Sequence, residues 1–283
     1  MVKNILLSPI LKWVGGKRQL LPEIIPLVNK KYSRYVEPFV GGGAVLFELQ
    51  PKKAIINDLN KELINVYLTV KDFPEELINQ LEKHNKNNAE DYFYDLRNKD
   101  RDIDYNKLTN IEKAARIIYL NKTCYNGLYR VNSAGQFNTP YGKYKNPNIV
   151  NETVIRAMSI YFRSSDIDIR NSDYREVLKG LRKGAFVYLD PPYMPISSSS
   201  SFTGYTENGF SYQEQKELKN ECDELIKKGI TFLQSNSDCE EIRDLYREKD
   251  GYKIKTVQAK RNINSKGNKR GEINEVLIYH DKK

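Results

Sequence analysis

The chain has 283 residues, of which 39% are hydrophobic, so it can bury a large core and still carry an inserted second part. Its 46 Lys and Arg outnumber its 37 Asp and Glu, giving a net charge of +9. Such a charge is compatible with nucleic acid as a partner, and the 20 tyrosines suit stacking on bases. No apolar stretch reaches membrane-spanning length, and Pro9 interrupts the short apolar N-terminus. We expect a soluble, cytoplasmic protein.

The cysteines and histidines give no sign of a metal site. Cys124, Cys222 and Cys239 lie far apart without a CxxC pair, which argues against zinc and disulfides and favours a reducing compartment. We expect Cys124 to be a packing residue. His84 and His280 stand in polar surroundings, so we expect both to be solvated. Neither a bound metal nor histidine-centred catalysis is expected.

Strands and helices alternate over the first sixty residues, which indicates a parallel α/β sheet. In chain order we expect a helix over 16–28, a strand over 34–39, a helix over 44–50 and a strand over 53–60. From about 65 to 165 the sequence becomes polar and mainly helical. Thr109 and Glu112 predict a capping box there, and the Asn-, Gly-, Pro- and Tyr-rich segment 123–148 predicts an ordered loop or hairpin.

The alternation resumes after residue 165. Ser211 and Glu214 predict a second capping box, and Gly229 predicts the end of that helix. The expected elements are strands near 167–170, 184–189 and 230–236, helices near 174–181, 212–228 and 239–247, and terminal strands over 252–259 and 274–280. We predict a mostly parallel, Rossmann-like sheet with helices on both faces and an inserted, mainly helical domain. The predicted division is 1–64 with 166–283 for the sheet and 65–165 for the insertion.

A glycine turn and an acid follow the first two predicted strands. Gly41, Gly42 and Gly43 stand between a strand and a helix, where backbone closely approaches a ligand. Leu46 replaces the third glycine of a dinucleotide fingerprint. Asp58 ends the next strand, where an acid suits the two hydroxyls of a ribose. Together these features favour a nucleoside-containing cofactor.

The segment "LKWVGGKRQL" resembles a phosphate loop only superficially. A Walker motif needs glycine at position 11 and Ser or Thr at position 18, where Leu11 and Arg18 stand. What remains is a Gly-Gly turn flanked by Trp13 and Lys17, a ring and a cation that suit a ligand.

The segment "LDPPY" places Asp190 after the apolar run "FVYL". The Asp190 carboxylate and the Pro191 carbonyl can both accept from one amino group, which frees the nitrogen lone pair to attack an electrophilic methyl. Pro191 and Pro192 fix this geometry because their φ angles are restricted, and Tyr193 can stack on a planar amide or base. We interpret these four residues as a catalytic motif acting on a planar amino group.

The motifs "LKWVGGKRQL", "EPFVGGGA", "NDLN" and "DPPY", together with "NKTCYNGLYRVNSAGQFNTPYGKY" in the insertion, resemble the Dam-like, alpha-group DNA adenine-N6 methyltransferases. The resemblance runs from about residue 11 to 278. It implies the methyltransferase form of the Rossmann-like fold and S-adenosylmethionine as cofactor. It also implies that 1–64 with 166–283 form the catalytic, cofactor-binding domain and that 65–165 form the DNA target-recognition domain. The cofactor-binding positions that it implies are Trp13, Lys17, Glu37, Phe39, Gly41, Gly43, Asp58, Asp173, Tyr174 and Asp190. Asp173 and Tyr174 match residues that contact the adenine of the cofactor.

The resemblance also implies DNA contacts. Lys12 matches a lysine that reads the first guanine, and Tyr125 and Asn126 match residues that wedge beside the vacated target base. The other implied contacts to bases and phosphates are Arg130, Pro140, Lys143 and Tyr144. An arginine is frequent at position 143, and Lys143 lacks its bidentate fork, which leaves the fine specificity open.

The expected function is methyl transfer from S-adenosylmethionine to N6 of an adenine in double-stranded DNA, after base flipping. GATC is the leading site, and a longer site containing GAT is the alternative. A protein-glutamine methyltransferase, which typically has Asn in place of Asp190, and an inert DNA-binding module are the rival interpretations. A restriction endonuclease acting on the same site would be a functional partner; the sequence leaves open a restriction-modification or an independent role.

Two low-complexity or charged segments have separate predictions. The serine run 197–201 predicts a mobile lid beside the catalytic motif. Basic residues between the last two predicted strands form either a solvated turn or, in a DNA-bound enzyme, contacts to phosphates. The basic residues are Lys260, Arg261, Lys266, Lys269 and Arg270.

Overall fold

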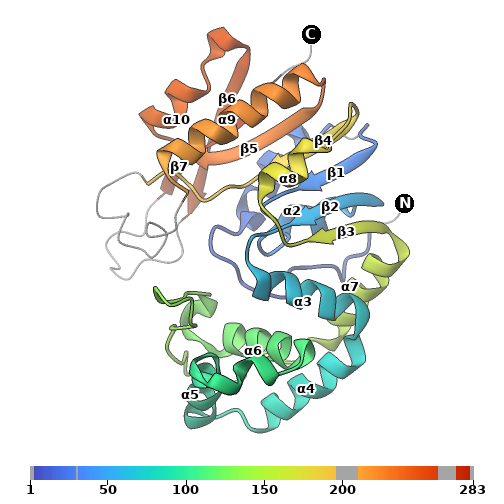
Figure 1. Cartoon of the computed structure of the whole chain (residues 1–283), viewed down its shortest axis with the longest axis vertical. Helices are drawn as coiled ribbons and strands as arrows, with labels where there is room; N and C mark the ends of the chain where they lie inside the picture. The colour runs from blue at the N-terminus through green and yellow to red at the C-terminus, as the bar shows by residue number, and fades with distance from the viewer. Residues whose placement is uncertain (1–2, 30, 196–209, 261–271, 281–283) are drawn as a thin grey trace. The chain divides into compact units, whose positions relative to one another are not determined.

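The computed structural model describes residues 3–29, 31–195, 210–260 and 272–280 (Figure 1). The chain forms two compact units, each assembled from several segments. The helical unit comprises Met1–Gly16, Gly41–Gln50 and Asp58–Asn171, and the sheet unit comprises Lys17–Val40, Pro51–Asn57 and Ser172–Lys283. The predicted boundary at 64/65 lies within a helix of the helical unit. The prediction assigned catalysis to 1–64 with 166–283 and target recognition to 65–165. These assignments stay predictions.

Seven strands form one sheet in the order β3-β2-β1-β4-β5-β7-β6 (Figure 1). Their bounds are β1 Arg34–Glu37, β2 Lys53–Asn57, β3 Asp166–Arg170, β4 Ala185–Leu189, β5 Thr231–Ser237, β6 Tyr252–Lys260 and β7 Glu272–His280. β1 pairs in parallel with β2 and β4, and β4 pairs in parallel with β5. β7 runs antiparallel to both β5 and β6. This confirms the predicted mostly parallel, Rossmann-like sheet.

The apolar core of the sheet unit lies under three helices, α8 Tyr174–Lys179, α9 Tyr212–Lys227 and α10 Glu240–Leu245. All five residues of β4 are buried, as expected of a central parallel strand. Because side chains alternate along a strand, Val187 faces this core while Phe186 packs against Tyr35 on the opposite face. The Ser211–Glu214 capping box is confirmed.

The opposite face of the sheet carries the segment that was predicted as one helix over 16–28. It forms three short pieces, η1 Lys17–Leu20, α1 Leu21–Ile24 and η2 Ile25–Leu27. Pro22 and Pro26 each stand in the first turn of a piece, because proline cannot donate within a helix interior. Lys255 of β6, which alternates with core-facing Ile254, binds Glu23 of α1 at 2.7 Å.

The helical unit contains six α-helices and β3 in its described part. The helices are α2 Ala44–Leu49, α3 Lys61–Asp72, α4 Pro74–Lys86, α5 Glu90–Asn98, α6 Asn110–Thr123 and α7 Glu152–Ser164. The predicted capping box starts α6, with Thr109 and Glu112 binding each other's backbone amide. Aromatic rings from α2, α3 and α7 fill part of the core. Phe47, Tyr67 and Phe162 lie with centroids 6.0–6.5 Å apart.

The predicted loop or hairpin after α6 is a hairpin with little regular structure. It begins with the short turn η5 Tyr125–Gly127, and isolated bridges join Cys124 to Tyr141 and Val131 to Phe137. Cys124 is fully buried, which confirms its packing role. The segment therefore holds its shape through side-chain and backbone contacts with the helices.

The prediction for His84 was wrong. His84 is buried in α4, its Nδ1 lies 2.7 Å from the hydroxyl of Tyr92, and its ring packs against Tyr119. Burial lowers the pKa of His84 to about 4, with the charge of Lys83 adding to the effect. The sequence around His84 is polar, and its aromatic partners come from other helices.

Three other expectations concern membrane spans, the serine run and the basic segment. No helix in the described ranges is long and apolar enough to cross a bilayer. The serine run predicted as a lid lies outside the described residues. The predicted phosphate-binding side chains from Lys260 onward do so as well.

Candidate active site

The carboxylate of Asp190 follows β4 directly and is held by two groups of the sheet unit. Lys17 Nζ lies 2.9 Å from Asp190 Oδ1, and Ser235 Oγ of β5 donates to the same oxygen at 2.8 Å. Lys17 is only 5% exposed, and a buried ammonium needs such a counter-charge. Because both contacts engage Oδ1, Oδ2 of Asp190 is positioned to accept another hydrogen bond.

Tyr193 is oriented by groups on its hydroxyl and on its ring. Its hydroxyl donates to Glu275 Oε2 of β7 at 2.6 Å, and Lys17 Nζ lies 4.6 Å from the ring centroid. Burial raises the pKa of Tyr193 well above its ordinary value, and the charges of Asp190 and Glu275 raise it further. Tyr193 therefore stays protonated at neutral pH. One face of its ring carries a cation–π contact.

The backbone of the Pro-Pro turn is held by buried amides that sequence reasoning missed. Gln215 of α9 donates to the carbonyl of Pro192 at 3.0 Å and accepts from Asn236 Nδ2 at 3.0 Å. Asn236 in turn accepts from the amide of Met194 at 3.1 Å, and Ser237 Oγ donates to the Met194 carbonyl at 2.6 Å. The signal in the sequence is the polar run "QSNS" that ends the apolar strand β5.

Phe39 and Tyr174 lie together with Phe210. The centroids of Phe39 and Tyr174 are 5.1 Å apart, and Phe210 lies 5.8 Å from each. The hydroxyl of Tyr174 is buried and lacks a hydrogen-bond partner among the described residues. A buried unsatisfied hydroxyl beside aromatic rings is an observation that fits a planar, polar ligand.

Asp173 and Glu37 have protein partners. Asp173 caps α8 by accepting from the amide of Arg175, whose guanidinium also lies 2.8 Å from Asp173 Oδ2. Glu37, buried at the end of β1, accepts from the Tyr35 hydroxyl at 2.8 Å. Their assignment to the cofactor stays a prediction.

In the helical unit, the glycine turn and Asp58 come together. Asp58 Oδ2 accepts from the amide of Gly41 at 3.0 Å, and Oδ1 accepts from the amide of Asn60 at 2.9 Å. Burial raises the pKa of Asp58, and these backbone amides oppose the shift. Asp58 thus joins the glycine turn before α2 to the start of α3.

The turn has no room for side chains at two of its glycines. Gly41 has φ +47°, and a Cβ there would lie 2.8 Å from Trp13 Cδ1. Gly43 has φ +73°, and a Cβ there would lie 2.9 Å from the Tyr67 hydroxyl. Both positions favour glycine, since an L-residue is strained at these φ angles and its Cβ would meet these rings. Trp13 therefore packs directly on the backbone of the turn.

Trp13 and Lys12 connect the N-terminal segment to the hairpin. Trp13 stacks on Tyr129 with centroids 4.8 Å apart. Asn121 of α6, which sequence reasoning also missed, binds both the amide and the carbonyl of Lys12 at 2.9 Å and the carbonyl of Gly127 at 3.0 Å. The side chain of Lys12 runs over Gly127, where a Cβ would lie 2.5 Å from Lys12 Cδ.

The other predicted DNA contacts are spread along the hairpin. Tyr125 is 56% exposed, and its amide donates to the carbonyl of the exposed Pro140 at 2.8 Å. Asn126 has a left-handed φ of 58°, which turns the chain sharply after Tyr125. Exposed aromatic and amide groups in such a turn suit contact with a base.

Three further predicted DNA contacts are exposed, namely Arg130, Lys143 and Tyr144. They differ in the side chains that they contact. Arg130 Nε donates to Asn138 Oδ1 at 2.8 Å. Lys143, at φ 53°, lies 3.6 Å from Glu90, and Tyr144 is 38% exposed. The residues implied for DNA contact therefore all belong to the helical unit.

The predicted site residues thus fall into two sets. Lys17, Asp190 and Tyr193 meet in the sheet unit, where Phe39 also meets Tyr174. Trp13, the glycine turn and Asp58 meet in the helical unit. Within the described ranges, no group of three or more His, Cys, Asp or Glu is arranged to hold a metal ion. The roles of these residues stay predictions.

The chain matches known DNA methyltransferases over most of its length. The family model for the D12 class N6 adenine-specific DNA methyltransferases matches residues 13–263. The chain is 46% identical to the type II methyltransferase M1.LlaDCHI of Lactococcus lactis subsp. cremoris, covering 96% of this chain and 95% of that one. It is 40% identical to the type II methyltransferase M.MjaIII of Methanocaldococcus jannaschii, covering 96% and 99%. It is 34% identical to the DNA adenine methylase of Serratia marcescens, covering 95% and 97%. The chain belongs to the D12 class of N6 adenine-specific DNA methyltransferases.

Proposed function

We propose that this adenine-N6 DNA methyltransferase acts on the adenine of GATC in double-stranded DNA and that the adenine leaves the duplex for the reaction. The observation that carries the amino-group chemistry is the carboxylate of Asp190, fixed through Oδ1 by Lys17 and Ser235. The choice of GATC is supported by the resemblance of the hairpin sequence to the target-recognition segment of the Dam-like enzymes. Base flipping is required by access, because N6 of a paired adenine is not reachable inside the stack.

Asp190 and Pro191 are the proposed acceptors for the adenine amino group. Asp190 Oδ2 accepts one N–H and the Pro191 carbonyl accepts the other. Gln215 binds the next carbonyl, that of Pro192, so the turn is held without using the proposed Pro191 acceptor. Two acceptors draw the amino hydrogens out of conjugation with the ring and localise the nitrogen lone pair. Preorganised acceptors of this kind need no rearrangement during the reaction.

Tyr193 is the proposed stacking surface for the flipped adenine. The hydroxyl is bound to Glu275 and one ring face is covered by Lys17, so the ring cannot rotate freely. A fixed ring supports a planar base better than a mobile one because less rotamer entropy is lost on binding. Tyr193 stays neutral, so its ring adds no charge beside the base.

The family's reaction depends on S-adenosylmethionine, and the residues present fit this cofactor. The buried hydroxyl of Tyr174 lacks a partner among the described residues, and aromatic rings surround it. We propose that Tyr174 and Asp173 hold the adenine end, that Asp58 accepts from the ribose hydroxyls, and that the backbone at Gly41 approaches the ligand closely. When bound, S-adenosylmethionine supplies the electrophilic methyl group. The remaining proposed cofactor contacts are Trp13, Lys17, Glu37, Phe39, Gly43 and Asp190.

The hairpin supports DNA readout. We propose that Lys12 reads the first guanine, that Tyr125 and Asn126 occupy the space left by the flipped base, and that Arg130 reads another base pair. Pro140, Lys143 and Tyr144 are the proposed further contacts. A longer site containing GAT remains the alternative, because Lys143 offers a point charge and no bidentate fork. Membership of a DNA methyltransferase family sets aside the protein-glutamine and inert-module interpretations.

The proposed setting is the cytoplasm, which fits a DNA substrate and three free cysteines. A restriction endonuclease that cuts at the same site is the proposed functional partner. Resistance of the methylated DNA to digestion by such an enzyme, together with cleavage of unmethylated DNA, would support this partnership.

Modified-base sequencing of unmethylated plasmid DNA, incubated with the protein and S-adenosylmethionine, tests the proposed target. We expect N6-methyladenine in every GATC. Methylation only at longer GAT-containing sites would favour the alternative, and methylation at sites without GAT would refute both. Base flipping is tested with 2-aminopurine at the target position, whose fluorescence should rise on binding. Unchanged fluorescence in a productive complex would contradict flipping.

A further inference from the structure

The central part of the hairpin, residues 130–138, is here called the recognition hairpin. Its two arms are joined by the Val131–Phe137 bridge and by a hydrogen bond of 2.9 Å from the amide of Asn138 to the carbonyl of Arg130. Arg130 also binds the side chain of Asn138 at 2.8 Å. The position of Arg130 is thus set by the arm that contains Phe137 and Asn138.

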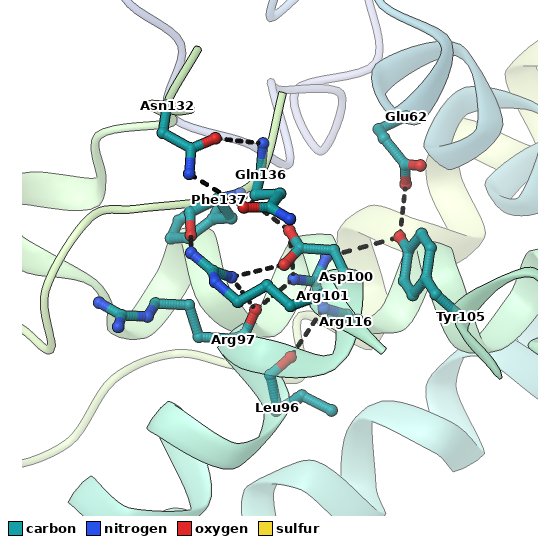
Figure 2. Close-up of polar contacts among 10 residues, drawn as sticks. All are labelled: Glu62, Leu96, Arg97, Asp100, Arg101, Tyr105, Arg116, Asn132, Gln136 and Phe137. Carbon is teal, nitrogen blue, oxygen red and sulfur yellow. Dashed lines mark hydrogen bonds and ion pairs between the residues drawn. The ribbon is translucent and has the colours of Figure 1, made fainter. Parts of the chain in front are cut away.

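Phe137 is clamped by two consecutive side chains from outside the recognition hairpin, as Figure 2 shows. Its amide donates to Asp100 Oδ2 at 2.8 Å, and its carbonyl accepts from Arg101 Nη2 at 2.9 Å. Asp100 and Arg101 belong to η3 Lys99–Arg101, which follows α5. Asp100 and Arg101 therefore hydrogen-bond both main-chain groups of Phe137, as the backbone of a neighbouring strand would in a sheet.

The clamp is fixed to the body of the helical unit by a buried arginine. Arg116 of α6 is 2% exposed, and its Nη2 lies 2.8 Å from Asp100 Oδ2 (Figure 2). The same guanidinium donates to the carbonyls of Leu96 and Arg97 at 2.7 Å, which belong to the last turn of α5. Carbonyls at a helix end lack partners within the helix, so Arg116 both satisfies them and fixes Asp100.

The Phe137 side chain links the recognition hairpin to Trp13 through the ring of Tyr129. It is 1% exposed and packs edge-on against Tyr129, with centroids 5.7 Å apart. Tyr129 in turn stacks on Trp13 at 4.8 Å. A shift of Phe137 would move the ring stack and also the next residue, Asn138, which is hydrogen-bonded to Arg130.

We propose that Asp100 and Arg101 are positioning residues for base readout: by clamping Phe137 they set the position of Arg130, and so the discrimination at the base pair that Arg130 reads. This proposal rests on the proposed function, in which Arg130 contacts a base. Hydrogen-bonded readout of a base edge depends on geometry, so loosening the recognition hairpin weakens discrimination even when every contacting side chain is present.

Arg101 is the residue to substitute. Replacing Asp100 would leave the buried charge of Arg116 unpaired and would destabilise the fold. Arg101→Met removes the bond from Nη2 to the Phe137 carbonyl, and with it the contacts of Nη1 to the Arg97 carbonyl and to Asp100. The Arg101 side chain is 30% exposed, so its removal leaves no large cavity. Arg163→Met is the matched control, because Arg163 also donates to main-chain carbonyls, those of Lys71 and Asp72 at 2.7 Å, within the same unit.

The experiment measures kcat and KM for DNA on a duplex with the site determined by modified-base sequencing and on duplexes with each base pair of that site changed in turn. We expect Arg101→Met to lower discrimination by about tenfold, as for the loss of one charged hydrogen bond, at the same base pair that Arg130→Ala affects. KM for S-adenosylmethionine should change little. The double variant with Arg130→Ala should lose no more discrimination there than Arg130→Ala alone. Arg163→Met should discriminate like the wild type.

Three results would overturn the proposal. They are unchanged discrimination in Arg101→Met, an equal loss in Arg163→Met, and additive losses in the double variant. Arg101→Lys, which keeps the charge and a donor, should recover part of the discrimination, and it replaces Arg101→Met if that variant is unfolded at the assay temperature. A wild-type enzyme without a defined site would instead contradict the proposed function, so the two failures are distinguishable.

Discussion

The ammonium of Lys17 lies 2.9 Å from Oδ1 of Asp190, although the two residues are 173 positions apart in the chain. Lys17 comes from the first turn of η1 and Asp190 from the end of β4. Their pairing joins a segment that sequence analysis assigned to ligand binding with the motif that it assigned to catalysis.

Lys17→Met should lower kcat strongly. The substitution keeps most of the apolar stem and removes the charge that fixes Asp190, so we expect a loss of about 30- to 150-fold, corresponding to a charged hydrogen bond of about 2–3 kcal/mol. Lys255→Met is the control, because Lys255 forms an exposed pair with Glu23 at 2.7 Å. Steady-state kinetics at saturating DNA and cofactor measure both. Equal kcat values for the two variants would contradict this role of Lys17.

Gln215→Leu should impair catalysis without abolishing cofactor binding. Gln215 is fully buried and its Nε2 holds the Pro192 carbonyl, so its loss frees the Pro-Pro turn and leaves Asn236 without an acceptor. We expect kcat to fall by about tenfold or more and the Kd for S-adenosylmethionine to stay within about threefold of wild type. Gln213→Leu on the exposed side of the same helix should have neither effect. A loss confined to cofactor affinity would argue against the proposed role.

Gly41→Ala should weaken cofactor binding. A Cβ at Gly41 would collide with the ring of Trp13, and the φ of +47° is strained for alanine. Gly135→Ala carries the same kind of strain at φ +74°, with nothing within 4 Å of the added Cβ. Calorimetric titration with S-adenosylmethionine should therefore show a Kd raised by about tenfold or more for Gly41→Ala only. Similar Kd values for the two variants would exclude a close approach of ligand to this turn.

His84 should make the protein less stable in acid. Its pKa is lowered in the folded state from 6.5 to about 4 by burial and by Lys83. The unfolded chain therefore binds the proton more readily, and the stabilisation present above pH 6.5 is lost as the pH falls toward 4. The difference is about 3 kcal/mol. Urea unfolding between pH 4 and 7.5 should show a weaker pH dependence for His84→Phe than for wild type, and parallel curves would contradict the assignment.

Local signals predicted the elements on which the site is built. The two capping boxes were predicted because the two residues of each pair accept hydrogen bonds from each other's backbone amide within one helical turn. The pairs are Thr109 with Glu112 and Ser211 with Glu214. The glycine turn was found because glycine is needed where φ is positive and the chain passes close to another group. The mostly parallel sheet was predicted from the alternation of strands and helices. These features depend on neighbours in sequence.

The parts that were missed depend on contacts between distant residues. Gln215 looks like any polar residue of an exposed helix, yet it is buried because Pro192 and Asn236 offer it partners. Asp100 and Arg101 look like a solvated charge pair, but they clamp Phe137, which lies more than 35 residues further along the chain. Such partners become visible only when the fold brings them together.

The central claim is that Asp190 accepts from the amino group that is methylated. Single-turnover methyl transfer to a duplex with the determined site, at saturating enzyme and cofactor, tests it with Asp190→Ala and Asp190→Asn. Cofactor binding and melting temperature are measured on the same preparations. The account predicts a lower melting temperature for Asp190→Ala, because Lys17 loses its counter-charge. At a temperature where the variant is folded and saturated with cofactor, it should transfer methyl at least about 100-fold more slowly. Transfer by Asp190→Ala at the wild-type rate would contradict it.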